Sequence, residues 1–115
     1  MPQSQDPTKQ PTDDGIAVDG TICDAILQRH WLQFRIGAMI HVVEPHRYGV
    51  MPDGHHALWA WNLVTGGSET SAQVGWAHYR LDEMRDVQML AETFEGPRPG
   101  YRRAKTAMRA IHSQL

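Results

Sequence analysis

The chain has 115 residues, a hydrophobic fraction of 41% and a net charge of −2, which suit one small domain with a single core. These values exclude a chain that binds nucleic acid through its overall charge, and one cysteine cannot form an internal disulfide, which favours a reducing compartment. The longest uncharged run, residues 54–68, is shorter than the ~20 apolar residues of a membrane helix, and the N-terminus shows no signal-peptide pattern, so we expect a cytoplasmic protein without a membrane partner.

The first predicted element is a short helix over residues 21–29. The preceding residues, 1–18, are polar and rich in proline, so we expect a disordered tail. Thr21 opens a Thr-x-x-Asp capping box, and Ile22 and Ile26 follow near one helical face. Cys23 is expected to be a small buried helix residue rather than a reactive thiol.

About five short strands follow, separated by turn residues. Alternation of apolar residues begins after His30 and stops at Gly37, and Pro45 is expected to end the second strand because it lacks a backbone donor. Residues 51–54, Met-Pro-Asp-Gly, form a turn. The predicted strands cover residues 32–36, 39–44, 57–65, 74–81 and 87–90, and residues 104–115 fit either a short helix or a final strand.

Strands without crossover helices pair antiparallel, so the order of elements predicts a mainly β fold. We expect a small antiparallel β-barrel of about five strands preceded by one short α-helix, in a single domain over residues 19–115. Charge is uneven: residues 1–27 carry −4, residues 28–95 carry −3 and residues 96–115 carry +5. The basic C-terminal segment either attracts an anionic partner or is a solvated end that touches the acidic body.

Taken in order, these pieces resemble a WYL domain from about Thr21 to the C-terminus. LQFRIG (32–37) matches a strand before a Gly turn, and VVEPHRYG (42–49) matches the element in which Glu-Pro follows the second strand. HHALWAWNL (55–63) covers the strand with the Trp-Tyr-Leu signature, and GWAHYRLDEMRDV (75–87) covers the next strand and turn. The resemblance implies an Sm-like or SH3-like barrel and a ligand-sensing role in bacterial transcription regulation, with nucleic acids or nucleotides as ligands.

The sequence departs from the family pattern where the ligand would bind. The run 58–61, Leu-Trp-Ala-Trp, replaces the signature, and Ala77 and Glu83 stand where the family has arginines, although Arg80 remains. His41 stands where arginine is frequent. Arginine recognises phosphate bidentately, so the site either takes another ligand or depends on pH through histidine. About 20 polar residues stand where usual members carry a DNA-reading unit, so we expect a separate partner to supply it.

Cations and aromatic rings are interleaved on the predicted strands, which favours a site that stacks bases and neutralises phosphates. Trp76, His78 and Arg80 share one strand face, and we expect His41 to face the same way two strands off. The candidate ligand-binding residues are Arg35, His41, Arg47, Tyr48, Trp76, His78 and Arg80.

The tryptophans of HHALWAWNL raise the question whether their rings fill the core or form the floor of a ligand site. A core too small to close with aliphatic residues needs large rings, so we expect Trp59 and Trp61 to be mostly core. A stacking floor would then involve Trp76 or Trp31.

Seven histidines suggest metal binding, but their spacing lacks His-x-x-x-His, so we expect no metal and no cofactor. Asp82 and Glu83 near His78 lack a nucleophile and an orienting group, so we predict no enzyme. The first hypothesis is a ligand-sensing regulatory domain that binds single-stranded nucleic acid or a nucleotide-like anion, in transcription-related or defence-related regulation. The alternative is an interaction module that forms a homo-oligomer or joins a separate DNA-binding regulator through open strand edges.

Overall fold

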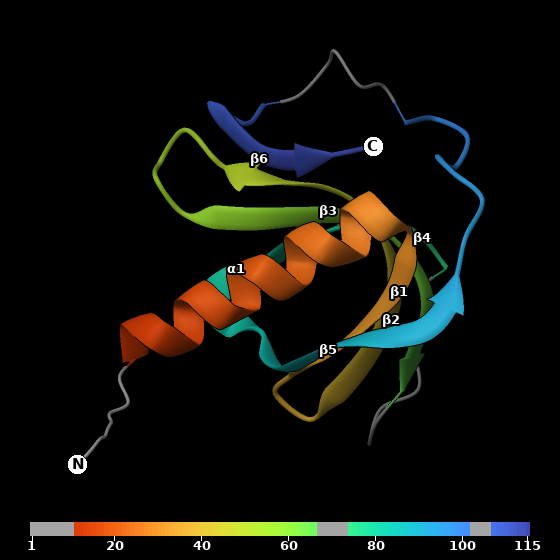
Figure 1. The fold of residues 1–115 in the computed structure, drawn as a ribbon, viewed down its shortest axis with the longest axis horizontal. Coiled ribbons are helices and arrows are strands. Elements are labelled where there is room, and N and C mark those ends of the chain that lie inside the picture. Colours follow the sequence, from red (N-terminus) through yellow and green to blue (C-terminus); the bar gives the residue numbers. More distant parts are fainter. Residues whose placement is uncertain (1–10, 67–73, 102–106) are drawn as a thin grey trace.

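The computed structural model describes residues 11–66, 74–101 and 107–115. One α-helix crosses one face of an antiparallel sheet of six strands (Figure 1), which confirms the expected mainly β fold with a helix before the strands. The elements in chain order are α1 (Pro11–Gln28), β1 (His30–Ile36), β2 (Met39–Val50), β3 (His56–Gly66), β4 (Gly75–Arg80), the 3-10 helix η1 (Leu81–Glu83), β5 (Arg85–Thr93) and β6 (Ala110–Gln114).

The strands follow the order β4, β3, β2, β1, β5 across the sheet, and β6 pairs with β2. β3 runs along one edge of β2, so the other edge is shared: β1 pairs with residues 39–43 and β6 pairs with residues 47–50. β4 and β5 are the two ends of this path. In the part of the chain that the structure describes, the sheet therefore does not close, and the expected barrel is not confirmed.

The helix begins ten residues earlier than the sequence predicted. Residues 11–18, which we expected in a disordered tail, are helical, and residues 1–10 lie outside the described residues. Val18, Ile22 and Ile26 recur every four residues and pack toward the sheet. Thr21 lies inside α1, so the expectation that its capping box begins the helix is wrong. Among the described residues, no helix combines the length and apolarity needed to cross a membrane.

β2 continues through Pro45, so the expectation that this residue ends the strand is wrong. Pro45 lies where pairing on one edge of β2 changes from β1, after Val43, to β6, which starts at Arg47. The missing N–H therefore falls in a gap between two ladders. On the β3 side, Pro45 and Arg47 pair with consecutive residues, which makes His46 the additional residue of a β-bulge.

The turns and the C-terminus resolve two further expectations. The turn at residues 51–54 is present: the Gly54 N–H donates to the Met51 carbonyl at 2.8 Å, and Gly54 has φ +96°. The C-terminal segment, left open between helix and strand, forms β6, although residues 102–106 lie outside the described residues. The expected Thr-Gly-Gly-Ser-Glu loop lies largely in the undescribed residues 67–73.

The core lies between α1 and one face of the sheet. Its buried side chains come from α1 and from β1, β2, β3 and β4, for example Ile22, Phe34, Tyr48 and Leu58, all with 0% exposure. Phe34 meets Tyr79 of β4 edge to face with ring centroids 4.9 Å apart. The sheet face turned away from α1 is not part of this core, and it holds the candidate site.

Candidate ligand-binding face

Two rows of side chains cross β2, β3 and β4 on the face turned away from α1. Residues directly opposite in an antiparallel ladder point to the same side of the sheet, so the register defines each row. In the order β2, β3, β4, the rows are Glu44, Trp61 and Trp76, and Arg47, Trp59 and His78. We call the four ring-bearing residues, Trp59, Trp61, Trp76 and His78, the aromatic face.

The rings of the aromatic face contact one another closely. Trp59 and Trp76 are nearly parallel, with ring centroids 5.1 Å apart and an interplanar angle of 10°. His78 lies 4.0 Å from Trp59, and Trp61 meets Trp76 edge to face at 5.4 Å. The three tryptophans are half-buried and His78 is exposed. The face is therefore an aromatic surface in partial contact with solvent.

Trp59 and Trp61 do not belong to the core, which corrects the expectation that they mostly fill it. Leu58 and Ala60 alternate with them along β3 and are buried on the α1 side. Because side chains of a strand alternate between its faces, two tryptophans two residues apart lie on the same opposite face. The core closes without them, since Phe34 and the tyrosines supply its large rings.

The segment Phe94–Tyr101, which we call the strap, follows β5 and lies against part of the aromatic face (blue in Figure 1). The Trp76 indole N–H donates to the Pro99 carbonyl at 3.0 Å, and the Tyr101 ring lies over Trp76 at 6.1 Å and 25°. Gly100 has φ +92°, and a Cβ there would lie 3.1 Å from the indole nitrogen. The strap therefore covers Trp76 closely.

Arg98 joins the strap to β2 through a bidentate ion pair. Its Nε donates to one Glu44 carboxylate oxygen at 2.7 Å and its Nη2 to the other at 3.1 Å. Glu44 is only 4% exposed, and the Arg98 guanidinium also lies 5.2 Å from the centre of the Trp61 ring. A buried carboxylate without a partner is costly, so this ion pair favours the closed position of the strap.

His46, the bulge residue, is fully buried under the strap. Its Nε2 accepts the backbone N–H of Arg98 at 3.0 Å, so this nitrogen carries no proton, and Nδ1 donates to the Glu44 carbonyl at 2.8 Å. The ring is therefore neutral. Burial lowers the pKa of His46, and the charges of Arg98 and Arg47 add to this effect, whereas the hydrogen bond to Glu44 and the Glu44 charge oppose it. Three rings surround it: Trp76 at 4.8 Å, Tyr101 at 5.2 Å and Phe94 at 5.7 Å.

A cleft of about 440 Å³ opens beside the strap, a volume within the range of small-ligand sites. Its walls come from β2 and from the strap itself, so its shape depends on where the strap lies. The lining residues are Glu44, Phe94, Glu95, Gly96, Pro97 and Arg98.

The structure brings three of the seven predicted site residues together. Trp76 and His78 belong to the aromatic face, and Arg47 lies in the row that contains His78. Arg47 is only 3% exposed; its Nε donates to Gln114 at 3.1 Å, and its guanidinium lies 4.9 Å from the centre of the Tyr101 ring. Arg47 therefore helps to hold the C-terminal strand and the strap. Burial, and secondarily the charge of His55, lowers the pKa of His78.

His41 and Tyr48 lie on the core side, so the expectation that His41 shares a face with His78 is wrong. His41 pairs with Phe34 in the β1–β2 ladder, and its ring lies 5.4 Å from Phe34 and 5.1 Å from Tyr79. Burial lowers the pKa of His41. The fully buried Tyr48 donates its hydroxyl hydrogen to the carboxylate of Asp19 in α1, and burial together with Asp19 raises the pKa of Tyr48.

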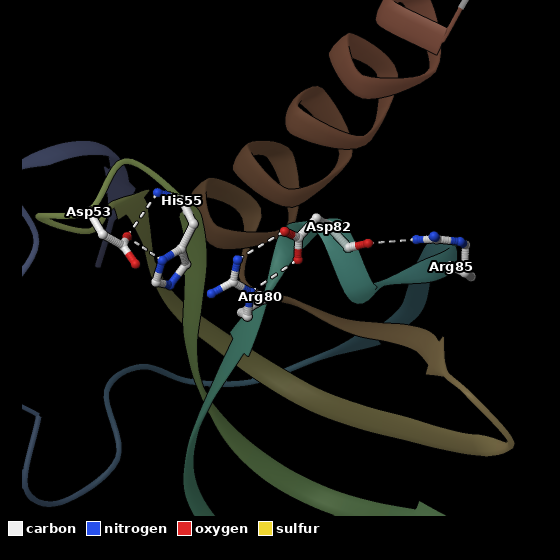
Figure 2. A network of polar contacts seen from close by, with 5 residues as sticks. All are labelled: Asp53, His55, Arg80, Asp82 and Arg85. Atoms are coloured by element: carbon white, nitrogen blue, oxygen red, sulfur yellow. Dashed lines mark hydrogen bonds and ion pairs between the residues drawn. The ribbon is translucent and has the colours of Figure 1, made fainter.

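Arg35 and Arg80 are near strand ends, and each contacts an aspartate. The Arg35 Nε lies 3.0 Å from Asp86, and Arg80 contacts both carboxylate oxygens of Asp82, at 3.2 and 3.0 Å (Figure 2). Arg85 donates to the Asp82 carbonyl at 3.0 Å in the same view. The hydrogen bond from Arg80 lowers the pKa of Asp82. A bound anion would have to compete with an aspartate for either arginine.

Sequence reasoning missed the residues that hold the strap: Glu44, His46, Arg98 and Tyr101. The one signal for them was that aromatic residues flank the Gly-Pro-Arg-Pro-Gly run, residues 96–100. Such a run indicates irregular backbone but not the surface against which it lies. Among the described residues, no three His, Cys, Asp or Glu side chains gather closely enough to hold a metal ion.

Comparisons of the chain with protein family models, curated proteins and solved structures give no match. The resemblance to WYL domains therefore stays a prediction that depends on the quoted motifs.

Proposed function

We propose that this chain is a small ligand-binding regulatory domain, similar to a WYL domain, which binds single-stranded nucleic acid or a nucleotide through its aromatic face. One observation carries the proposal: Trp59 and Trp76 lie nearly parallel beside the exposed His78 on the outer side of the sheet. A base that stacks on such rings gains roughly 1–3 kcal/mol. Stacking there leaves the core between α1 and the sheet undisturbed.

The charges near this face favour an anionic ligand but limit the electrostatic contribution. Arg35, Arg80 and Arg98 each already contact a carboxylate, so few cations are available without exchange of partners. The segment 96–115 carries a net charge of +5 in the sequence, and its Arg98 lies at the face. We therefore expect affinity to depend on stacking more than on phosphate contacts, with a shallow dependence on salt concentration.

The finer fold assignment belongs to the same proposal. An Sm-like or SH3-like barrel needs a meander whose fifth strand returns beside the first, and the pairing of β5 with β1 supports it. The regulatory role, in transcription-related or defence-related control, is supported by the resemblance to WYL domains alone. α1 is the one α-helix among the described residues, so these residues form no helix-turn-helix unit, and promoter reading by them is not part of the proposal.

The test is anisotropy of a labelled single-stranded oligonucleotide of about ten nucleotides, as DNA and as RNA, titrated at two salt concentrations. Trp59→Ala removes the central ring and should weaken binding by roughly 5–150-fold, the factor that corresponds to ~1–3 kcal/mol. Trp59→Phe keeps a flat ring and serves as the matched control, with affinity within a few-fold of the wild type. No saturable binding by the wild type, or equal affinity of Trp59→Ala, would refute the proposal.

A second candidate function, a protein-interaction module, is favoured by the open ends of the sheet. β4 and β5 each have one edge without a partner strand among the described residues, and Val74, just before β4, is 66% exposed. Sedimentation analysis over a hundredfold range of concentration tests self-association. A mass that rises with concentration supports this candidate, and a monomer throughout argues against a homo-oligomer.

A further inference from the structure

We propose that the strap is a pH-dependent latch, in which protonation of His46 releases Phe94–Tyr101 and uncovers Trp61 and Trp76. The inference deepens the proposed function, since it regulates access to the same face, and it rests on that function only for the identity of the ligand. Opening of the latch is measurable without any ligand.

The hydrogen bonds of both His46 ring nitrogens depend on the protonation state of the ring. In the closed state Nδ1 donates and Nε2 accepts, and the accepted hydrogen is the backbone N–H of Arg98. A protonated ring carries a hydrogen on both nitrogens, so Nε2–H would point at N–H of Arg98. Two donors cannot form a hydrogen bond, and no water reaches a ring with 0% exposure. The charged ring is therefore incompatible with the closed strap.

Charged side chains of both signs act on His46. From β2, the Glu44 carboxylate favours the protonated ring and Arg47 opposes it; from the strap, Arg98 opposes it and the Tyr101 ring packs against it edge to face. Trp76 of β4 and Phe94 of the strap bring no charge. Glu44 is already paired with Arg98, so little of its charge remains to hold an imidazolium.

The stability of the closed strap falls as pH falls. Burial lowers the pKa of His46 in the closed state, so the closed state binds fewer protons than the open state. The closed strap is fully stable above the ordinary histidine pKa of about 6.5 and loses stability as pH falls below it. Mild acid thus opens the latch, whereas neutral pH keeps it closed.

Opening of the strap exposes more of the aromatic face. The strap contributes the Arg98 guanidinium over Trp61 and the Pro99 carbonyl and Tyr101 ring on Trp76. When these contacts separate, the half-covered rings join Trp59 as one stacking surface. The protonated His46 also adds a positive charge next to it, which favours a phosphate group.

The Trp76 indole N–H reports the latch directly because it donates to Pro99. We would follow its hydrogen exchange and the His46 ring signals by NMR from pH 8 to pH 5, without ligand. After correction for intrinsic exchange, protection should fall about tenfold as His46 takes up its proton, the factor that one lost hydrogen bond implies. An indole that stays protected while His46 titrates would overturn the latch, as would a His46 that takes up no proton before the protein unfolds.

Variants separate the latch from a general loss of stability. The double variant Glu44→Gln with Arg98→Gln removes the ion pair without leaving a buried charge, and its Trp76 indole should exchange quickly at both ends of the pH range. His46→Gln should lose the pH dependence; if it does not fold, the wild type decides, because its Trp76 indole must lose protection over the same pH range in which the His46 ring signals titrate. His112→Gln removes an exposed histidine of β6 and should keep the wild-type profile. A pH step at the Trp76 indole that persists in a folded His46→Gln variant would refute the latch.

The ligand experiment distinguishes the two proposals. Oligonucleotide affinity should rise from pH 8 to pH 5.5 in the wild type, and rise less in the double variant, where His78 still titrates but the strap is already open. Loss of all binding with an intact pH step at Trp76 would refute the proposed function and keep the latch. Binding with no pH step at Trp76 would refute the latch alone.

Discussion

The replacement Tyr48→Phe tests whether Tyr48 is structural, as its position indicates, or part of the ligand site, as the sequence suggested. Its hydroxyl is buried and donates to the Asp19 carboxylate of α1. A hydrogen bond to a charged group contributes about 1.5–3 kcal/mol, and its removal leaves Asp19 short of one donor. At about 4 °C per kcal/mol for a chain of this size, Tm should fall by roughly 6–12 °C.

The matched control is Tyr79→Phe, since Tyr79 is also buried but its hydroxyl donates to no group among the described residues. It should change stability by less than ~0.5 kcal/mol. Urea unfolding monitored by tryptophan fluorescence measures both variants, and a double-mutant cycle with Asp19→Ala isolates the pair. Equal stability of the two variants, together with weaker oligonucleotide binding by Tyr48→Phe, would refute this reasoning and return Tyr48 to the site.

Two further replacements test the packing of β6 and the role of Arg80. Gly49→Ala places a Cβ 2.2 Å from the Ala110 carbonyl oxygen, so β6 must shift, and we expect a loss of at least ~1–3 kcal/mol in urea unfolding. Gly20→Ala is its control with the opposite sign, because nothing lies within 4 Å and alanine favours a helix by about 1 kcal/mol. Arg80→Ala should leave the urea midpoint unchanged because its pair with Asp82 is solvent-exposed, and unchanged oligonucleotide affinity would remove Arg80 from the site.

The sequence predicted elements better than it predicted faces. Alternation located the strands, because period-two burial is a local property of each segment. The orientation of His41 relative to His78 depends on register across three strands, which no single strand specifies. Trp59 and Trp61 were assigned to the core from their size, although their spacing only required that they share a face. The longer helix was missed because its first turns lie in a polar segment.

The strap was beyond the reach of sequence patterns for a different reason. Arg98 and Glu44 are 54 residues apart, and neither belongs to a sequence motif from which its partner could be identified. Gly-Pro-rich segments lack the periodicity that reveals burial, so Phe94 and Tyr101 looked like ordinary loop residues. Two of the departures from the predicted pattern, the continuation of β2 through Pro45 and the contacts of the strap, therefore lie at the bulge in β2.

Two features of β2 place His46 outside the ladder. Pro45 supplies no N–H where β2 changes neighbours, and the bulge that follows turns one extra residue, His46, out of the ladder. Its backbone carbonyl is still satisfied, because the N–H of Leu115 donates to it at 2.9 Å. The backbone carbonyl of His46 is thus held by Leu115, whereas the ring depends on the strap for its Nε2 partner. A strand without a bulge would have no residue outside the ladder whose ring could contact the strap. The bulge that the sequence did not predict is therefore also what makes the proposed latch possible.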